Sequence, residues 1–590
     1  MKKFFSTMLG AFVGTWLAFL IFGIVIFVSG IVMMASMTFS SLKMPVASVS
    51  DNSVLVLNLS GSIPERSQKA NFQDLLEDTY SVPDNLKDIL SAISIAKYDS
   101  RINGIVVKCN GASAGFATAK TIRDALSDFR NSGKWIYAYG ESLAQGDYYI
   151  ASLADSIYMN PVGMLDLHGV VSGIPFFKNT LEKIGVEMQI IRVGTFKSAV
   201  EPYMLTEMSE ANRLQTQTYI SNLWNNLTDS IAVSRKIRRE VINQFADSLG
   251  MFSPANDVVK KGFVDGLCYV HEFESKVRMA LGLSEDTEIP AVTVSELLTT
   301  ASNTESSNKI AVVYANGAIV VSGDKNGINS SELVPEILDL AKDDEIKGLV
   351  LRVNSPGGSA YASEQIWEAL EQFKKTGKPF AVSMGDYAAS GGYYISCGAD
   401  RIFAEPTTLT GSIGIYAMVP CMSGLLTDKL GVNFDFVKTN ANTDISTVKP
   451  LTEFQKASFQ KNVNAGYELF TSRCAVGRKM NINKLKSIAE GRVWDGMEAK
   501  KIGLVDEFGN VTDAVNWVAT QAGIIGDYSV SDYPKTKEDF LDLLFSSMSE
   551  SYYKMNMQER FGNFYPLIEQ VENMLKQDEL QCRMEYIEFK

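Results

Sequence analysis

The covalent chemistry that this sequence offers centres on one serine, Ser390. It lies in the run Met384–Tyr394 (MGDYAASGGYY), after two alanines and before two glycines. Small residues at these positions leave the backbone amides beside the hydroxyl uncovered, as stabilisation of an oxyanion requires. The same run would also suit a tight strand-to-helix turn without chemistry. The catalytic interpretation therefore depends on finding a base for the serine.

Two kinds of side chain are candidates for that base. A Ser-His-Asp arrangement would need His168 or His271, the two histidines of the chain. For both, an ordinary surface or core position is the favoured interpretation. A lysine can serve instead if burial or a nearby cation lowers its pKa from about 10.4 toward about 7 or 8. Lys197 is a candidate because it follows the apolar run MQIIRV and has apolar neighbours.

The elements that must position these residues occur twice in the chain. The segment INGIVVKCNGASAGFATAKTIRDALSDFRNSGK, from Ile102, matches IKGLVLRVNSPGGSAYASEQIWEALEQFKKTGK, from Ile346, 244 positions later. VKKGFVDGL, from Val259, likewise matches AKKIGLVDEFG, from Ala499. Because these matches follow one another in the same order, they indicate a tandem duplication.

Each copy alternates β-rich apolar runs with segments of helical periodicity, which predicts an α/β fold with mostly parallel strands. We expect a first repeat over 46–300 and a second over 308–533, joined by a Ser/Thr/Asn-rich linker at Ser295–Lys309. The tail over 534–590 is predicted to form amphipathic helices, used for packing or assembly.

Residues 1–45 are predicted to anchor the protein in a membrane. After Lys2 and Lys3 no charged residue appears until Lys43, and the apolar run between them is long enough for a transmembrane helix of about 20 residues. This length favours a retained anchor over a cleaved signal peptide. The two lysines favour an inside N-terminus, so the rest of the chain is expected on the outer side.

The overall composition excludes several other classes of function. The net charge is −13, and no Lys/Arg-rich run suggests a nucleic-acid partner. None of the six cysteines lies in a CxxC pair, so we expect neither a zinc site nor a disulfide framework, and predict small buried side chains instead.

The two copies have kept different residues of a possible site. Ser390 aligns with Gln145, and the glycine pair Gly357–Gly358 aligns with Ser113–Ala114. Lys197, in contrast, belongs to the first copy and faces no lysine in the second. If the serine and the glycines were needed only for folding, the first copy should need them too. One composite site at the interface of the two copies explains why the first copy lacks the serine and the second lacks the lysine.

These motifs resemble those of the signal peptide peptidase A family, bacterial membrane-anchored serine proteases, in its long duplicated form. The resemblance rests on RVGTFKSAVEPY, NSPGG, MGDYAASGGYYI and LTGSIGI, and covers nearly the whole chain. It implies two tandem ClpP/crotonase-like repeats. It also implies that Ser390, in the A-S-G-G motif, is the nucleophile and that Lys197, in the K-S-A-V-E-P motif, is its general base.

The resemblance carries further expectations. Backbone amides of Gly357, Gly358 and Gly391 are expected to form an oxyanion hole, and Ser412 of GSIGI is a candidate for orienting the lysine. The family implies a dome-like homotetramer in the bacterial inner (cytoplasmic) membrane, with its catalytic part on the periplasmic side. Its substrates would be hydrophobic remnants of cleaved signal peptides, and no metal or other cofactor is implied.

Three alternatives remain open at this point. A crotonase-type acyl-CoA enzyme would share the glycine-rich turn but would need neither Ser390 nor Lys197. A non-catalytic membrane scaffold would not need to keep the serine, the lysine and the glycines together. A general envelope quality-control protease would use the same residues on misfolded proteins instead of signal peptides.

Overall fold

The computed structural model describes little of either end of the chain. Apart from isolated positions between 8 and 23, the described residues are 49–66, 84–300, 306–324, 326–535 and 580–584. The predicted anchor at 1–45, apart from those positions, and the parts of the predicted helical tail at 536–579 and 585–590 therefore lie outside the described residues. Among the described residues, no helix combines the length and apolar character needed to cross a bilayer.

The first repeat is built on a six-stranded sheet in which all paired strands are parallel, in the order β6-β4-β3-β2-β1-β7. Helices α3 (Leu86–Tyr98) and α4 (Phe116–Arg130) bury their apolar faces in the same core as its strands. The strands are β1 (Ser53–Ser62), β2 (Ile102–Ser113), β3 (Trp135–Gly140), β4 (Ser156–Met159), β6 (Gly266–Leu267) and β7 (Ala291–Thr293). The remaining helices of this repeat are α5 (Gln145–Ala151), α6 (Lys178–Ile184), α7 (Glu201–Met204), α8 (Glu210–Arg235), α9 (Arg239–Asp247), α10 (Ala255–Lys260), α11 (Val270–Ala280) and α12 (Val294–Thr300), with the 3₁₀ turns η1 (Ser198–Val200) and η2 (Gly250–Phe252).

The second repeat has a corresponding sheet of eight strands, with the order β17-β15-β13-β11-β8-β19, with β14 added beside β13 and β18 beside β14. All pairs are parallel except β15 with β17. The repeated α/β architecture predicted from the sequence is thus confirmed. The strands are β8 (Lys309–Asn316), β11 (Ile346–Ser355), β13 (Phe380–Ala389), β14 (Arg401–Ala404), β15 (Leu409–Gly411), β17 (Val493–Asp495), β18 (Glu507–Phe508) and β19 (Ser529–Tyr533). The helices are α13 (Ser330–Lys342), α14 (Ala360–Lys375), α15 (Gly391–Ser396), α16 (Glu453–Gly477), α17 (Ile482–Ile488), α18 (Gly496–Ile502) and α19 (Val511–Ala522), with the π-helical turn η3 (Gly424–Lys429).

A third sheet joins the two repeats, in the order β10-β9-β12-β20-β16-β5. Strand β5 of the first repeat pairs antiparallel with β16 of the second along its whole length. Strand β20 comes from the tail, so this part of the predicted helical tail is a strand in the structure, because it pairs with a strand on either side. The strands are β5 (Glu187–Val193), β9 (Ile319–Val320), β10 (Ile328–Asn329), β12 (Gly357–Ser359), β16 (Ile415–Cys421) and β20 (Leu580–Arg583).

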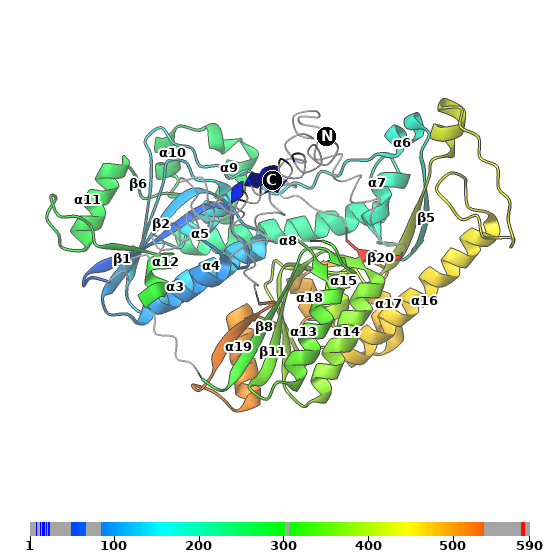
Figure 1. Cartoon of the computed structure of the whole chain (residues 1–590). Helices are drawn as coiled ribbons and strands as arrows, with labels where there is room; N and C mark the ends of the chain where they lie inside the picture. The colour runs from blue at the N-terminus through cyan, green and yellow to red at the C-terminus, as the bar shows by residue number, and fades with distance from the viewer. Residues whose placement is uncertain are drawn as a thin grey trace.

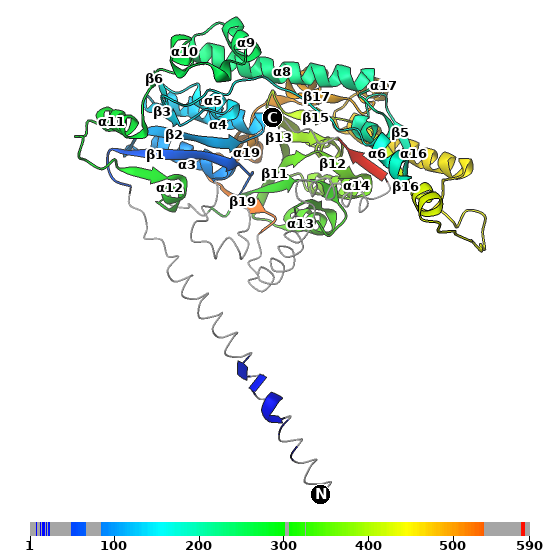
Figure 2. The same ribbon diagram turned by 90° about the horizontal axis from the view of Figure 1, so that it is seen from above.

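Buried polar contacts fix the two repeats against each other. The carboxylate of Asp386, in β13, accepts hydrogen bonds from the amides of Ala117 and Thr118, 2.8 and 3.1 Å away, at the start of α4. Such a cap satisfies amides that the helix itself cannot pair. Arg352 forms a buried ion pair with Glu65 at 2.9 Å. Figures 1 and 2 both show α8 running from the first repeat along the second.

Candidate active site

Lys197 reaches the site from the turn that follows β5. The amide of Phe196 donates to the carbonyl of Glu490 at 3.0 Å, which fixes this turn to the second repeat. Gly491 then lies directly against the lysine, and a Cβ atom on Gly491 would be 2.8 Å from Lys197 Cα. Since Gly491 also has a φ of +76°, no other residue fits here without strain.

Ser390 lies at the point where β13 ends and α15 begins. Its backbone has φ 56° and ψ −110°, a combination that residues other than glycine rarely adopt. Such strain costs on the order of 1–3 kcal/mol and persists where the surroundings enforce it, typically at functional sites. Here the Ser390 amide donates to the carbonyl of Gly411 at 2.7 Å, which holds the turn in place.

The structure brings Lys197 and Ser390 together across the interface of the two repeats. The Nζ atom of Lys197 is 2.8 Å from Oγ of Ser390 and 3.1 Å from both the hydroxyl and the carbonyl oxygen of Ser412. All three residues are buried. The predicted composite pair is therefore within hydrogen-bonding distance, and Ser412 is placed where it can fix the direction of the amine.

Burial lowers the pKa of the Lys197 amine, as a general base at neutral pH requires. Loss of solvent lowers the pKa of Lys197 from 10.5 to about 7, against a smaller opposing effect of the Cys582 thiol. Burial disfavours the charged form of an amine, and no carboxylate contributes to the shift. Near pH 8 the amine is mostly neutral, so its lone pair can accept the Ser390 proton while its hydrogens are donated to Ser412.

The three predicted glycines lie in tightly packed backbone, two of them in β12 and one directly after Ser390. Gly357 has a φ of +98°, and a Cβ atom there would lie 2.7 Å from the amide nitrogen of Gly391. A Cβ on Gly358 would lie 2.0 Å from the carbonyl oxygen of Ile319. Side chains are thus excluded at Gly357 and Gly358, and the Gly357 amide donates to the hydroxyl of Ser355 at 3.2 Å.

Neither histidine takes part in this arrangement. The His168 ring is paired with Asp166 at 2.7 Å and is exposed. His271 is exposed on α11, where its ring stacks on that of Tyr269. Among the described residues, the side chain hydrogen-bonded to the Ser390 hydroxyl is that of Lys197.

The equivalent region of the first repeat holds a buried carboxyl group in place of a hydroxyl. Asp147, at the start of α5, is buried and accepts hydrogen bonds from the amides of Gly111 and Ala112 at 2.8 and 3.0 Å. Burial raises the pKa of this carboxyl to about 6. When α5 and α15 are aligned by their N-cap residues, Ser390 corresponds to Ala144. The sequence comparison aligns it with Gln145, one residue later. Either pairing leaves the first repeat without a nucleophile.

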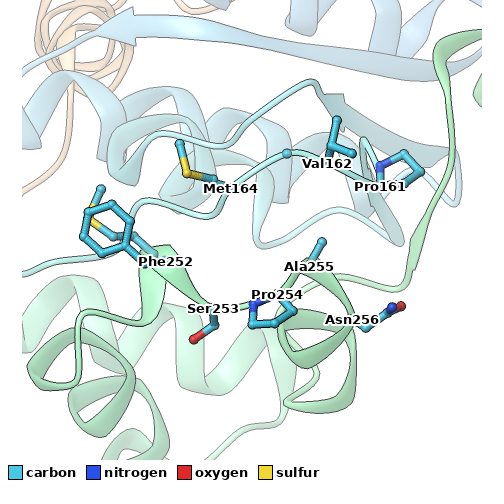
Figure 3. A pocket seen from close by; sticks show the side chains of 10 residues that line it. Pro161, Val162, Met164, Phe252, Ser253, Pro254, Ala255 and Asn256 are labelled. Carbon is cyan, nitrogen blue, oxygen red and sulfur yellow. The ribbon is translucent and has the colours of Figure 1, made fainter.

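A cavity of about 370 Å³ lies elsewhere in the first repeat (Figure 3). It is lined by the loop segments 161–164 and 251–256, and none of these residues has a titratable side chain. The cavity therefore adds no acid, base or nucleophile to the site around Ser390.

Two contributors to the site were missed by sequence reasoning. Gly491 lies in the short run EGRVW, where a lone glycine gives little signal. Cys582 was predicted only as a small buried residue, and it is buried, as are the other five cysteines. Its carbonyl oxygen, however, would be 2.3 Å from a Cβ on Gly357, so it lies inside the site.

Comparison with known proteins agrees with the duplicated architecture. The sequence model of Peptidase family S49 matches residues 128–284 and 372–524, and that of Clp protease matches residues 301–408. Protease 4 of Haemophilus influenzae is 32% identical over 567 residues, which cover 93% of this chain and 92% of that protein. Protease 4 of Salmonella typhi is 37% identical, covering 79% and 76%. Serine protease SPPA, chloroplastic, of Arabidopsis thaliana is 28% identical, covering 79% and 70%.

Proposed function

Starting from the fact that this chain belongs to peptidase family S49 and is a serine protease, we propose that it is a membrane-anchored endopeptidase with a Ser-Lys dyad. Ser390 is the nucleophile and Lys197 the general base in this proposal. The observation that carries it is the 2.8 Å contact between the buried Lys197 amine and the Ser390 hydroxyl. A crotonase-type enzyme or a non-catalytic scaffold gives no reason for this contact.

In the proposed reaction, neutral Lys197 takes the hydroxyl proton as Ser390 Oγ attacks the carbonyl carbon of the peptide bond. The protonated amine then gives its proton to the leaving nitrogen, and an acyl-enzyme ester remains on Ser390. Water, deprotonated by the same lysine, hydrolyses this ester and frees the serine. Ser412 keeps the amine aimed at the reacting oxygen through both halves of the cycle.

The negative charge that develops on the carbonyl oxygen needs hydrogen-bond donors. We assign this role to the backbone amides of Gly358 and Gly391, and to that of Gly357 once it releases the Ser355 hydroxyl, to which it donates at 3.2 Å. None of the three residues has a side chain that could block the oxygen. Donors that are already in place stabilise such an oxyanion without reorganisation.

The proposed substrates are hydrophobic signal peptides left after preprotein cleavage. Two features support this substrate class: the long apolar run within residues 1–45, and a relative from Enterococcus faecium, 36% identical over 242 residues, named a putative signal peptide peptidase. The proposed setting is the bacterial inner membrane, with the catalytic part on its periplasmic side and four copies in one assembly. Misfolded envelope proteins are the second candidate substrate, because the same dyad would cleave them.

A serine-reactive phosphonate tests the proposed chemistry together with peptide hydrolysis. The full-length protein in detergent is incubated with the phosphonate, and the modified residue is located by mass spectrometry. We expect a single modification on Ser390 and a matching loss of cleavage of an apolar signal-peptide sequence. Modification of a different serine with full loss of activity would contradict the assignment. Faster cleavage of an unfolded polar protein than of the apolar peptide would favour the quality-control alternative.

A further inference from the structure

Gln215 of α8 lies between the turn that carries Lys197 and strand β17 of the second repeat. It belongs to the helix that Figures 1 and 2 show running from the first repeat along the second. Its side chain is only 2% exposed. A glutamine amide has an oxygen that accepts and a nitrogen that donates, so a buried one needs partners at both ends.

The nitrogen of this amide contacts the lysine turn, which we define as residues 194–198. Nε2 of Gln215 is 3.2 Å from the carbonyl oxygen of Phe196 and 3.1 Å from the hydroxyl of Ser198. These two residues come directly before and directly after Lys197 in the chain. The Gln215 amide therefore holds the lysine turn on both sides of the proposed base.

The oxygen of the same amide contacts the second repeat. Oε1 of Gln215 accepts a hydrogen bond from the amide of Val493, in β17, at 3.1 Å. If nitrogen and oxygen were exchanged, two donors would face each other at Val493 and two acceptors at the Phe196 carbonyl. The partners at the two ends therefore determine the orientation of this amide.

Strand β17 in turn supports both serines of the site. Val493 pairs with Gly411 in β15, and the carbonyl oxygen of Gly411 accepts the Ser390 amide at 2.7 Å. The amide of Ser412 donates to the carbonyl of Arg492 at 2.7 Å. One buried side chain thus joins the lysine turn to the backbone that fixes Ser390 and Ser412.

The Gln215 side chain is itself held by a polar network. Its Nε2 is 3.1 Å from Oδ1 of Asn212, and the Asn212 amide nitrogen donates to the buried carboxylate of Glu201 at 3.1 Å. Arg192 donates to the carbonyl of Lys197 at 3.0 Å and lies 3.7 Å from the Glu201 carboxylate. The start of α8 and the chain on either side of Lys197 are therefore tied to one carboxylate.

We propose that Gln215 is a positioning residue for catalysis, which keeps the Lys197 amine aimed at the Ser390 hydroxyl. This inference rests on the proposed function of Lys197 as general base. Gln215 acts through the lysine turn, whose displacement by about 1 Å can lower a reaction rate about 100-fold. A residue that only stabilises the interface of the repeats would change the unfolding temperature without a specific effect on the amine.

Gln215→Met tests this inference, because methionine fills a similar volume but has no amide to join the two repeats. We expect kcat for an apolar peptide to fall at least about tenfold, with KM within about twofold of wild type. The rise of phosphonate labelling with pH should move above pH 7, since a looser turn lets water reach the amine and returns its pKa toward 10.5. Gln217→Met, at an exposed position of the same helix, is the matched control and should behave like wild type.

The same substitution in the Lys197→Met background separates positioning of the amine from a general effect on the fold. At about pH 8, Gln215→Met should slow labelling of Ser390 at least about tenfold when Lys197 is present, but less than about twofold when it is absent. Equal slowing in both backgrounds would overturn the inference. If Gln215→Met does not fold, as judged by its thermal unfolding, Gln215→Asn takes its place with the same expected results, because its amide is too short to hold both contacts.

The single variants distinguish failure of this inference from failure of the proposed function. If Lys197→Met is labelled slowly while Gln215→Met keeps the wild-type rate and pH dependence, the inference is wrong and the proposed function stands. If Lys197→Met is labelled as fast as wild type, the lysine is not the base, and the proposed function fails together with the inference.

Discussion

Ser390→Ala is expected to lower kcat/KM for an apolar peptide by at least about 10⁴-fold, because the variant has no oxygen that can form the acyl-enzyme. The loss should fall on kcat, since the strands that bind the peptide are unchanged. Folding should be preserved, because the Ser390 side chain contributes one hydrogen bond, to Lys197, to the described contacts. Steady-state kinetics and the thermal unfolding midpoint check both parts of this prediction.

Gln145→Ala is the matched control for this variant. Gln145 lies at the start of α5, near the first-repeat position that corresponds to Ser390, but outside the composite site. We expect its activity to be within about twofold of wild type. Equal activity of Ser390→Ala and Gln145→Ala would show that the serine is not the nucleophile.

Lys197→Met is expected to have the second large effect, a loss of at least about 10³-fold in kcat. Methionine fills a similar volume but cannot accept the serine proton or return it to the leaving nitrogen. Lys178→Met, a substitution at a half-buried position on α6 of the same repeat, should leave kcat unchanged. Peptide hydrolysis by the two variants under identical conditions tests the role of the amine. Full activity in Lys197→Met would exclude the lysine as base.

Lys197→Met should stabilise the folded protein even though it removes activity. The pKa of Lys197 is about 7 in the folded protein, against 10.5 for the unperturbed side chain. Between these values the unfolded state binds more protons, so the free energy of unfolding of wild type rises with pH, by about 1.4 kcal/mol per pH unit from this group. Below about pH 7 the cost of burying the charge is fully present. Lys197→Met should therefore unfold at a higher temperature than wild type near pH 6, and the difference should shrink toward pH 10.

The duplication made much of the fold and the central pair predictable from the sequence. Repeated strand and helix patterns indicated two α/β units, and the structure has a mainly parallel sheet in each. Because the first copy lacks the serine and the second lacks the lysine, the comparison of the copies also indicated that Lys197 and Ser390 are partners. The contact between them confirms that the two residues lie together, while their catalytic roles remain proposals.

Contacts between distant segments could not be predicted in this way. No local pattern shows that Asp386 caps a helix 268 positions earlier in the chain, since the cap depends on how the repeats dock. The strand character of β20 also arises from its two neighbours, and its sequence LQCR gives little signal alone. The prediction of a helix at these residues was wrong, because the helical periodicity of the adjoining tail was extended over them.

The central claim is that a neutral amine from one repeat activates a hydroxyl from the other. The pH dependence of phosphonate labelling at Ser390 tests it most directly, because labelling requires the activated hydroxyl but no peptide binding. The rate should rise with an apparent pKa near 7 and level off above about pH 8, and Lys197→Met should remove this rise. A rate in wild type that is flat between about pH 5 and pH 9, or one that Lys197→Met leaves unchanged, would contradict the account.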